Sequence, residues 1–483
     1  MKFKMKPTGF QEGSCMYRTR QIRIKKGHRL WKYGAGLCER SAMLYNRANF
    51  LVRQYATAVR DLENGAGPED LYKNQKEVYA LVRRTTGGSR YEPKGKWLTY
   101  GQLDYILKRT EDPSYRAMPA QANQQILKRI VRDHSSFFEA LKVWQKHPEQ
   151  FTGRPGLPRY RKKGSLMTAV LTNQICRISE GHYLKFPGTK TRLNLGNIPE
   201  GTRLKEVRIK PGNGDLTVEV VLEVQADNCL QGRSGSLTQE ELSGRLAGTG
   251  MKELRAAAID MGVDNFCAVA NNFGAAPFLI KGGMIKSGNR YYNKRLAELR
   301  SEAMRCNKKH MTRRIGRLTD RRNRIIKDQM HKASRCITTW AEENKVEVIV
   351  LGHNRFQKQG IRNGHVNNQN FVQIPYSVFA GMLRYKLEEK GIALLETEES
   401  YTSKADFLAG DRMPVYGKER DAGEGENLQF SGKRIRRGLY RHWDGTISNA
   451  DINGAANILR KVIPNEKGWD RGVVDTPYVV GIA

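Results

Sequence analysis

The sequence contains few acidic residues for its length. It has 49 Asp and Glu against 84 Lys and Arg in 483 residues, which gives a formal charge of +35 and a pI near 10.0. An excess of one sign on this scale repels itself in a compact fold unless an opposite charge neutralises it. The shortage therefore argues against a basic or neutral partner and indicates a polyanion such as nucleic acid.

Long apolar runs and paired cysteines are also missing. No stretch resembles a membrane-spanning helix, and the opening residues, MKFKMKPTGFQEGS, lack the apolar core of a signal peptide. We therefore expect a soluble cytoplasmic protein. No two cysteines have CxxC spacing, which argues against a disulfide framework or a zinc site and favours reduced, buried thiols. The seven are Cys15, Cys38, Cys176, Cys229, Cys267, Cys306 and Cys336.

The apolar pattern changes once along the first half of the chain. From Trp31 to about Trp144 apolar residues recur at helical spacing. The run GRPGLPRYRKKG then breaks the pattern with two prolines, and β-branched, alternating segments follow it. Hydrophobic residues make up 39% of the chain, enough to build packed cores. This order predicts a helical domain followed by a small β-barrel or sheet.

The second half alternates between strand and helix patterns. The polar, glycine-rich segment from Gln225 to Met251 predicts a linker. After it, apolar runs typical of strands alternate with amphipathic helices, which predicts an α/β domain. The expected strands are Leu254 to Ile259, Phe266 to Ala270, Val346 to Leu351 and Ile392 to Leu395, and the expected helices lie within Tyr291 to Glu343, Phe379 to Lys390 and Asp451 to Lys461.

Clusters of basic residues, two of them interleaved with aromatics, mark three candidate nucleic-acid contacts. Such a mixture offers phosphate contact together with base stacking, although a solvated surface has the same composition. The candidates are Arg90, Tyr91, Lys94, Trp97 and Tyr100 in the first half, Arg314 and Arg321 in the long helical segment, and Arg434, Arg436 and Arg437 in the run FSGKRIRRGLYRHW.

Two aspartates stand in places that suit either structure or chemistry. Asp260 ends an apolar strand, where a carboxylate must be solvated or paired, but it also fits a turn before Gly262. Asp451 opens a helix, where a simple N-cap is an equally good explanation. Both interpretations stay open on pattern alone, although paired carboxylates are the ligands that magnesium prefers for phosphodiester cleavage.

The surrounding motifs resemble a known family. AAAIDMGVDNFCAVANN is similar to the first RuvC motif of the TnpB nucleases, and NADINGAANILRK is similar to the third. LYNRANFLVRQY, LTNQICRI and the segment from Phe371 to Leu408 also resemble TnpB and the compact type V CRISPR effectors. The resemblance implies an RNase H-like RuvC domain with catalytic, metal-binding Asp260 and Asp451. It implies two Mg²⁺ ions, replaceable by Mn²⁺, a guide RNA and a double-stranded DNA target in a prokaryotic cytoplasm.

One catalytic position departs from the family pattern. The second RuvC motif normally ends its strand with a glutamate, but VEVIVLGHN carries Gly352 there. Some relatives, including certain eukaryotic Fanzor proteins, have this glycine together with a glutamate three positions before a Thr-Ser pair on the next strand. Glu399 matches that arrangement and is expected to be the third catalytic and metal-binding residue. Glu398 is the alternative, because successive strand residues point to opposite faces.

A second departure concerns the insertion before the last motif. TnpB proteins usually carry a four-cysteine zinc ribbon there, whereas residues 403–449 contain no cysteine. The acidic and histidine residues of the insertion lack zinc-finger spacing, so we expect a zinc-free version held by its apolar residues. These residues are Asp406, Asp411, Asp421, Glu424 and His442.

The resemblance predicts the division of the chain and its function. The expected function is RNA-guided cleavage of DNA beside a short motif read by the helical and barrel domains. The alternative is a nuclease-inactive, RNA-guided repressor, and a transposon or CRISPR origin and the oligomeric state stay open. The expected parts are 1–14 and 161–235 (wedge barrel), 15–160 (helical recognition domain), 236–252 (linker), 253–402 (RuvC with helical insertion 286–343), 403–449 (target-nucleic-acid-binding insertion) and 450–483 (RuvC end).

Overall fold

The computed structural model divides the chain into two compact units, Cys15–Gln225 and the remainder. The described residues are 15–225, 254–308, 310–353, 373–414, 429–463, 471–474 and 476–482. Both units combine helices and strands, so the predicted α/β multidomain class is confirmed. The segments 1–14 and 236–252, predicted as part of the barrel and as a linker, lie outside the described residues.

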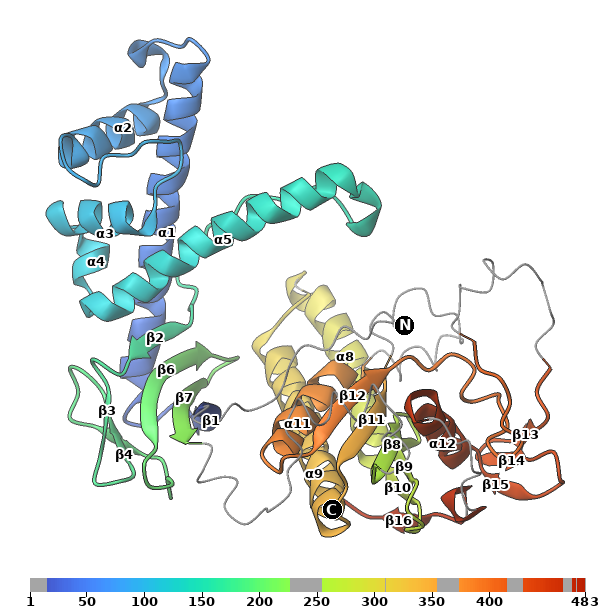
Figure 1. Cartoon of the computed structure of the whole chain (residues 1–483). Helices are drawn as coiled ribbons and strands as arrows, with labels where there is room; N and C mark the ends of the chain where they lie inside the picture. The colour runs from blue at the N-terminus through green and yellow to red at the C-terminus, as the bar shows by residue number, and fades with distance from the viewer. Residues whose placement is uncertain are drawn as a thin grey trace. The chain divides into compact units, whose positions relative to one another are not determined.

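Helices build most of the first unit (Figure 1). A strand, β1 (Cys15–Ile24), comes first, where a helical domain was expected to begin, and the long helix α1 (Trp31–Glu63) follows it. Leu37, Leu44 and Leu51 recur on one face of α1 and are fully buried there. The other helices pack along this face or beside it: α2 (Lys73–Thr86), α3 (Tyr100–Arg109), α4 (Pro113–Arg116) and α5 (Ala120–Lys146).

The main sheet of this unit is open, so the predicted β-barrel is wrong. Its strands lie in the order β1, β7, β6, β2, and no described strand joins the two edges. Helix α1 covers the sheet so closely that a Cβ atom on Gly34 would lie 2.8 Å from Leu216 and 3.3 Å from Ile209. Because a helix already buries the apolar face, the sheet does not need to close on itself. The strands are β2 (Ala169–Thr172), β6 (Arg203–Pro211) and β7 (Leu216–Gln225).

A six-stranded sheet forms the centre of the second unit, in the order β12, β11, β8, β9, β10, β16. Strands β8, β9 and β10 are antiparallel neighbours, whereas β11 runs parallel to β8 and β12 parallel to β11. The strands are β8 (Ala256–Asp260), β9 (Asn265–Asn271), β10 (Phe278–Lys281), β11 (Val348–Gly352), β12 (Ala393–Thr397) and β16 (Tyr478–Val480).

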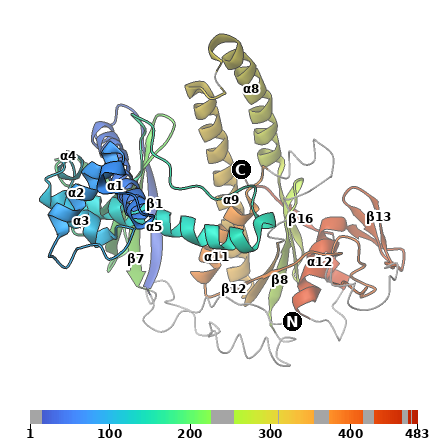
Figure 2. The same cartoon turned by 90° about the horizontal axis from the view of Figure 1, so that it is seen from above.

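Helices cover both faces of this sheet, as Figures 1 and 2 show. Ala257 and Ile259 of β8 pack with α9 (Arg313–Glu343) and α11 (Tyr376–Glu388) on one face. Ala256 and Ala258 pack with α12 (Ala450–Val462) on the other. With both faces buried, β8 has no polar residue before Asp260, which explains its uninterrupted apolar run.

A helix pair and a small sheet also belong to the second unit. Helices α8 (Gly283–Asn307) and α9 form the antiparallel pair expected from the sequence, and Figure 2 shows them side by side. The strands β13 (Lys433–Arg436), β14 (Leu439–Arg441) and β15 (Ile447–Asn449) form a small antiparallel sheet in the insertion.

The described cysteines differ in burial. Cys38, Cys176 and Cys267 are buried, as expected, but Cys336 is half-buried and Cys306 is exposed, and all five are free thiols. In the described part of the chain, no helix combines the length and the apolar character needed to cross a membrane.

Candidate active site

Asp260 lies at the carboxyl end of β8, on the face of the sheet that α12 covers. Alternation along the strand places its side chain on the same face as Ala256 and Ala258. At Gly454 of α12 a Cβ atom would lie 2.7 Å from Asp260 Oδ2, closer than real contacts allow. Glycine at this position therefore lets the helix approach the carboxylate directly.

Glu399 occupies the space left empty by Gly352. Gly352 ends β11, the parallel neighbour of β8, and Glu399 follows the end of β12 by two residues. A Cβ atom on Gly352 would lie 2.6 Å from Glu399 Oε1 and 2.5 Å from Ile458 Cδ1. The missing side chain at position 352 and the glutamate side chain that arrives from the next strand are thus sterically complementary.

Asp451 lies in the first turn of α12, and its backbone is part of a helix cap. The Oδ1 atom of Asn449 accepts hydrogen bonds from the backbone N–H groups of Asp451, at 3.0 Å, and Ile452, at 3.3 Å. Asn449 is therefore the N-cap, and the side chain of Asp451 is left for other contacts. Its two oxygens accept hydrogen bonds from Asn265 of β9, at 2.7 Å, and from Arg434 of β13, at 3.0 Å.

The electrostatics of Asp260 show that the three carboxylates act on one another. Burial raises the pKa of Asp260 well above its ordinary value, and the charges of Glu399 and Asp451 raise it further, while Arg434 opposes them. A cation bound among these carboxyl groups would offset their repulsion and favour the ionised form of Asp260. In the described part of the chain no three acidic, histidine or cysteine side chains are already arranged as metal ligands. Asp451 is held by protein groups instead.

Glu398, the alternative to Glu399, has a different environment. Its carboxylate pairs with the buried ammonium group of Lys461 on α12 and accepts a hydrogen bond from the backbone N–H of Ser400 at 2.7 Å. Burial raises the pKa of Glu398, but the hydrogen bonds from Lys461 and Ser400 outweigh burial and leave the pKa below its ordinary value. Glu398 is therefore a neutralised ion-pair partner, whereas Glu399 faces Asp260.

The basic hairpin of the insertion reaches the same region. Arg434 pairs with Asp451, and Arg437 pairs with Asp264 in the turn between β8 and β9. Arg436, the third predicted residue of this group, is exposed. The basic motif by itself gave no indication that Arg434 would pair with Asp451 or Arg437 with Asp264.

The aromatic residues of this run are not all available for stacking. Tyr440 is fully buried and donates a hydrogen bond to the backbone oxygen of Lys404 at 2.7 Å, whereas Trp443 is 62% exposed. Asp406 and His442 are also buried, so the interior of the insertion contains charged and polar groups where apolar residues alone were expected. Asp421 and Glu424 lie outside the described residues.

The predicted contacts between α2 and α3 divide into packed aromatics and exposed cations. Tyr91 stacks on Tyr105 with ring centroids 4.4 Å apart, and Trp97 packs edge-on against Phe138 at 4.8 Å. The third aromatic, Tyr100, lies under the ammonium group of Lys128. Arg90 and Lys94 are exposed, and they are the members of the group best placed for a phosphate.

The two predicted arginines of the long helical segment lie on the surface of α9. Arg314 is exposed and forms a hydrogen bond with Glu302 of α8 at 3.2 Å. Arg321 is also exposed. Both side chains are therefore accessible from solvent, and contact of either with nucleic acid stays a prediction.

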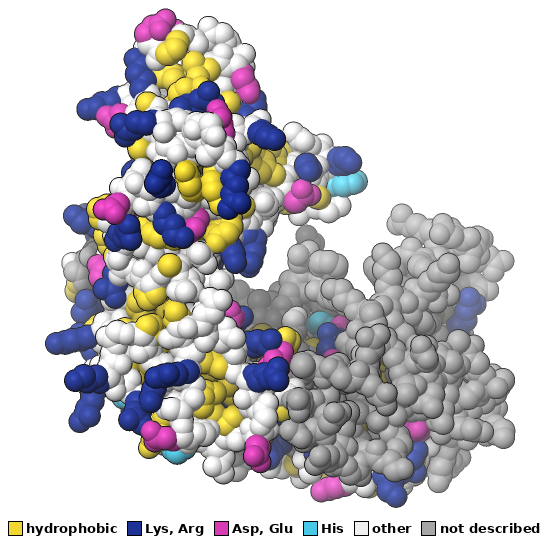
Figure 3. Space-filling model, turned by 60° about the vertical axis from the view of Figure 1, so that its left-hand side comes forward, with side chains coloured by type: hydrophobic (Ala, Val, Ile, Leu, Met, Phe, Trp, Pro, Cys, Tyr) yellow, Lys and Arg dark blue, Asp and Glu magenta, His cyan; other side chains and the backbone are white. Residues whose placement is uncertain are grey.

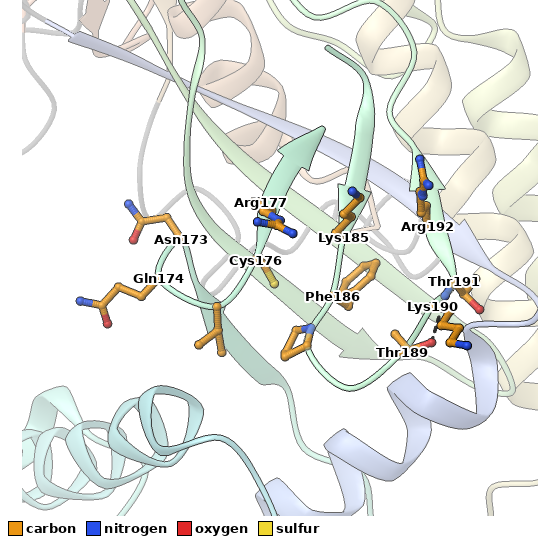
Figure 4. Close-up of a pocket in the computed structure, with 12 residues that line it drawn as sticks. Asn173, Gln174, Cys176, Arg177, Lys185, Phe186, Thr189, Lys190, Thr191 and Arg192 are labelled. Atoms are coloured by element: carbon orange, nitrogen blue, oxygen red, sulfur yellow. Dashed lines mark hydrogen bonds between the residues drawn. The ribbon is translucent and has the colours of Figure 1, made fainter. Parts of the chain in front are cut away.

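The first unit carries an open basic pocket. It has a volume of about 720 Å³ and lies on the sheet of β3 (Arg177–Ser179), β4 (Tyr183–Lys185) and β5 (Arg192–Asn194) (Figure 4). Arg177 is directly opposite Lys185, and Lys185 is directly opposite Arg192. In the described part of the chain neither Arg177 nor Lys185 has an acidic partner, although Arg192 pairs with Glu180.

Like charges directly opposite one another destabilise a sheet unless an anion lies between them. On the face that Figure 3 shows, the first unit carries many lysine and arginine side chains and fewer acidic ones. We name Arg177, Lys185 and Arg192 the basic row. Its chemistry suits a sugar-phosphate backbone.

Two family models match the sequence. A probable transposase model, OrfB_IS605, matches residues 249–356, and a Cas12f1-like TNB domain model matches residues 376–458. The first range contains Asp260 and Gly352, and the second contains Glu399 and Asp451. The predicted resemblance to TnpB and to compact type V effectors is thereby confirmed. No curated protein matches the chain significantly.

Several solved structures are similar over most of the chain. A Cas12f1–sgRNA–target DNA complex has 13% identity and a TM-score of 0.45, covering 91% of this chain and 83% of that one. C2c1 of Alicyclobacillus acidoterrestris with single-guide RNA has 9% identity and a TM-score of 0.42, covering 92% and 88%. Similarity at this level is too low to assign an activity.

Proposed function

We propose that this chain, which resembles TnpB-type transposases and Cas12f1-like effectors, is an RNA-guided DNA endonuclease. It binds a guide RNA, pairs the guide with one strand of double-stranded DNA beside a short motif, and cuts both strands at one site. That site is formed by Asp260, Glu399 and Asp451. Genomic context, either a transposon end or a CRISPR array, distinguishes the two origins.

The observation that carries the proposal is the steric match between Gly352 and Glu399. Loss of the usual glutamate alone would indicate a nuclease without activity. Instead, a glutamate from the adjacent strand fills the vacated space, with Oε1 2.6 Å from the position of the missing Cβ atom, and its charge acts on Asp260. Simple loss of the third carboxylate does not account for a glutamate side chain in that space.

The order of the strands supports an RNase H-like, RuvC-type domain in the second unit. Three antiparallel strands, β10, β9 and β8, are followed across the sheet by the parallel strands β11 and β12. Asp260 lies at the end of β8, in the middle of the sheet, and the other two candidate ligands come from the segment after β12 and from the first turn of α12. The boundaries 253–402 and 450–483 for this domain are part of the proposal.

The donor set suits magnesium. Asp260, Glu399 and Asp451 supply carboxylate oxygens only, and their mutual repulsion is relieved by a hard divalent cation. When bound, magnesium would supply the Lewis-acid charge needed to activate water and to stabilise the leaving oxygen of a phosphodiester. Arg434 donates a hydrogen bond to Asp451. If its guanidinium group bonds to a DNA phosphate in place of Asp451, the Asp451 oxygen becomes free for the cation.

The first unit is proposed to bind the guide RNA and the duplex beside the target. The basic row on β3, β4 and β5 has two cations without acidic partners among the described residues, and phosphates would remove their mutual repulsion. Arg90 and Lys94, exposed between α2 and α3, are the candidates for contact with the adjacent DNA motif. Arg436 and Arg321 would contact the target strand or the guide.

The central experiment separates binding from cutting. The protein is purified with RNA from its native locus, and Asp260→Ala, Glu399→Ala and Asp451→Ala are compared with the wild type. Each variant should lose cutting while keeping RNA and target binding, because backbone contacts and base pairing supply that affinity. Double variants should lose little more than single ones, as expected for residues that act as one unit.

The competing function is RNA-guided binding without cleavage. The contact that favours it is the one between Arg434 and Asp451, since this contact occupies a candidate ligand oxygen. A wild-type complex that binds its target tightly and never cuts it in magnesium or manganese would establish this alternative. If Glu398→Ala abolishes cutting and Glu399→Ala does not, the assignment of the third carboxylate is wrong by one residue.

A further inference from the structure

The insertion contains a buried carboxylate with a nearly complete set of partners. Asp406 is fully buried. Its Oδ1 atom lies 2.6 Å from His442 Nδ1 and accepts a hydrogen bond from the backbone N–H of Leu408 at 2.9 Å, while its Oδ2 accepts one from the backbone N–H of Trp443 at 2.7 Å. Burial raises the pKa of Asp406, but the bonds from His442 and the backbone outweigh it and lower the pKa, so Asp406 stays ionised.

His442 connects this carboxylate to the strand before α12. Because an ionised carboxylate only accepts, His442 Nδ1 is the donor in the bond to Asp406. The other ring nitrogen, Nε2, lies 2.7 Å from the hydroxyl of Ser448 in β15. With both nitrogens engaged and the ring 3% exposed, His442 has no free position for a metal ion.

This network ends at a candidate catalytic residue. Ser448 is followed directly by Asn449, the N-cap that holds the first turn of α12 and with it Asp451. On the other side of Asp406, the buried Asn453 of α12 accepts a hydrogen bond from the backbone N–H of Phe407 at 3.1 Å and donates one to the backbone oxygen of Ala405 at 2.9 Å. The first turn of α12 is therefore held from both sides by the loop that contains Asp406.

The same network shapes the basic hairpin. His442 follows β14, and β14 pairs with β13, which carries Arg434. Tyr440 of β14 packs against His442 with ring centroids 5.2 Å apart and bonds to the loop before Asp406 through Lys404. The strand that presents Arg434 and the helix turn that presents Asp451 thus share one polar core.

We propose that Asp406, His442 and Ser448 form a positioning network that holds Asp451 and Arg434 in place, as a bound zinc ion does in a cysteine ribbon. The inference rests on the proposed function and adds three residues to it. An ionised, fully buried and multiply hydrogen-bonded group has one low-energy arrangement, which is the property that a structural metal supplies. Cutting by this protein should therefore be independent of zinc.

The test uses Ser448→Ala in the full-length protein with its guide RNA. The substitution leaves the bond between Asp406 and His442 intact but releases the ring from β15. The magnesium concentration for half-maximal cutting should rise about 10-fold, within the 10 to 100-fold range seen when supports of metal ligands are removed. Affinity for guide RNA and target, and the melting temperature, should stay close to wild type. Thr446→Ala is the matched control, because its hydroxyl bonds only to Asp444 in the same exposed turn.

A second pair of variants tests the histidine. His442→Ala should raise the magnesium requirement more than Ser448→Ala does, and His442→Asn should restore part of the loss because its amide can still donate to Asp406. Removal of zinc with a selective chelator should leave wild-type cutting unchanged. Two results refute this inference alone, provided that the wild-type protein cuts. One is an unchanged magnesium requirement in Ser448→Ala and His442→Ala, and the other is loss of wild-type cutting when zinc is removed. A wild-type protein that never cuts refutes the proposed function and this inference with it.

Discussion

Moving the third carboxylate back to position 352 is the most direct test of the rearranged site, in which Glu399 replaces the glutamate that the family usually carries at that position. Glu399→Gly removes the side chain that lies 2.6 Å from the Gly352 Cβ position, and Gly352→Glu restores a glutamate to the end of β11. Loss of a ligand costs more than loss of its support, so Glu399→Gly should reduce cutting by about 100-fold or more. Gly352→Glu alone should also be inactive, because it adds a charge beside Asp260 in an occupied space.

The steric cost of the new side chain can be worked out from the structure. A Cβ atom at position 352 would lie 2.5 Å from Ile458 Cδ1, so a shift of about 1 Å is needed for ordinary contact, at an overpacking cost of about 1 to 3 kcal/mol. Ile458→Val deletes this one carbon at a cost of about 0.5 to 1.5 kcal/mol. The triple variant Gly352→Glu, Glu399→Gly, Ile458→Val should therefore fold and recover cutting at least 10-fold over either glutamate variant.

The assay is cleavage of a labelled target by the purified guide complex at saturating magnesium, with target binding measured in parallel. Glu398→Gln is the matched control, since it weakens the pair with Lys461 without touching the space at Gly352. Wild-type rates in Glu399→Gly would refute the rearranged site. A triple variant that folds and binds its target but cuts no better than the single variants would falsify the steric argument.

Three further outcomes follow from the structure. Burial, and then a nearby arginine charge, lowers the pKa of His134 from 6.5 to about 4. Because the ring in the unfolded chain takes up its proton at the higher pH, the contribution of neutral His134 to the free energy of unfolding is fully present above about pH 6.5 and is lost as pH falls toward 4. His134→Gln should flatten this pH dependence in melting curves. Replacing Arg177 and Lys185 with alanine should weaken guide RNA binding and reduce the slope of log affinity against log salt by about 1.4, measured in a salt titration; an unchanged slope would place no phosphate there. Arg434→Ala removes the arginine that competes with magnesium for Asp451, so half-maximal cutting should need less magnesium while the rate at saturation falls. An unchanged magnesium requirement would show that Arg434 and magnesium do not compete.

Much of the second unit could be predicted from local sequence. The strands ending at Asp260 and Gly352 are buried on both faces, so each is an unbroken apolar run. The start of α12 was predicted to within one residue, although its N-cap is Asn449, two residues before Asp451, and not Asp451 itself. Such features depend on neighbouring residues in the chain, and periodicity and capping record them directly.

Local pattern failed where the outcome depended on packing between distant segments. The β-barrel was predicted because alternating strands are compatible with either an open or a closed sheet, and the close approach of α1 at Gly34 decided for the open one. In the same way, an aspartate and a histidine in a polar insertion gave no sign that they would become a buried pair. Burial of a charge is decided by the elements that surround it.

The sequence by itself determined the basic character of the protein, its helical and α/β halves, and Asp260 and Asp451 as candidates through motif resemblance. It left Glu398 and Glu399 as alternatives, because the two residues are adjacent and chemically alike. Tertiary structure gives the two residues different surroundings: Glu398 pairs with the ammonium group of Lys461, and Glu399 lies in the space beside Gly352. The physical reason is that a carboxylate takes its role from the charges and volumes around it, and α12 brings those groups from a distant part of the chain.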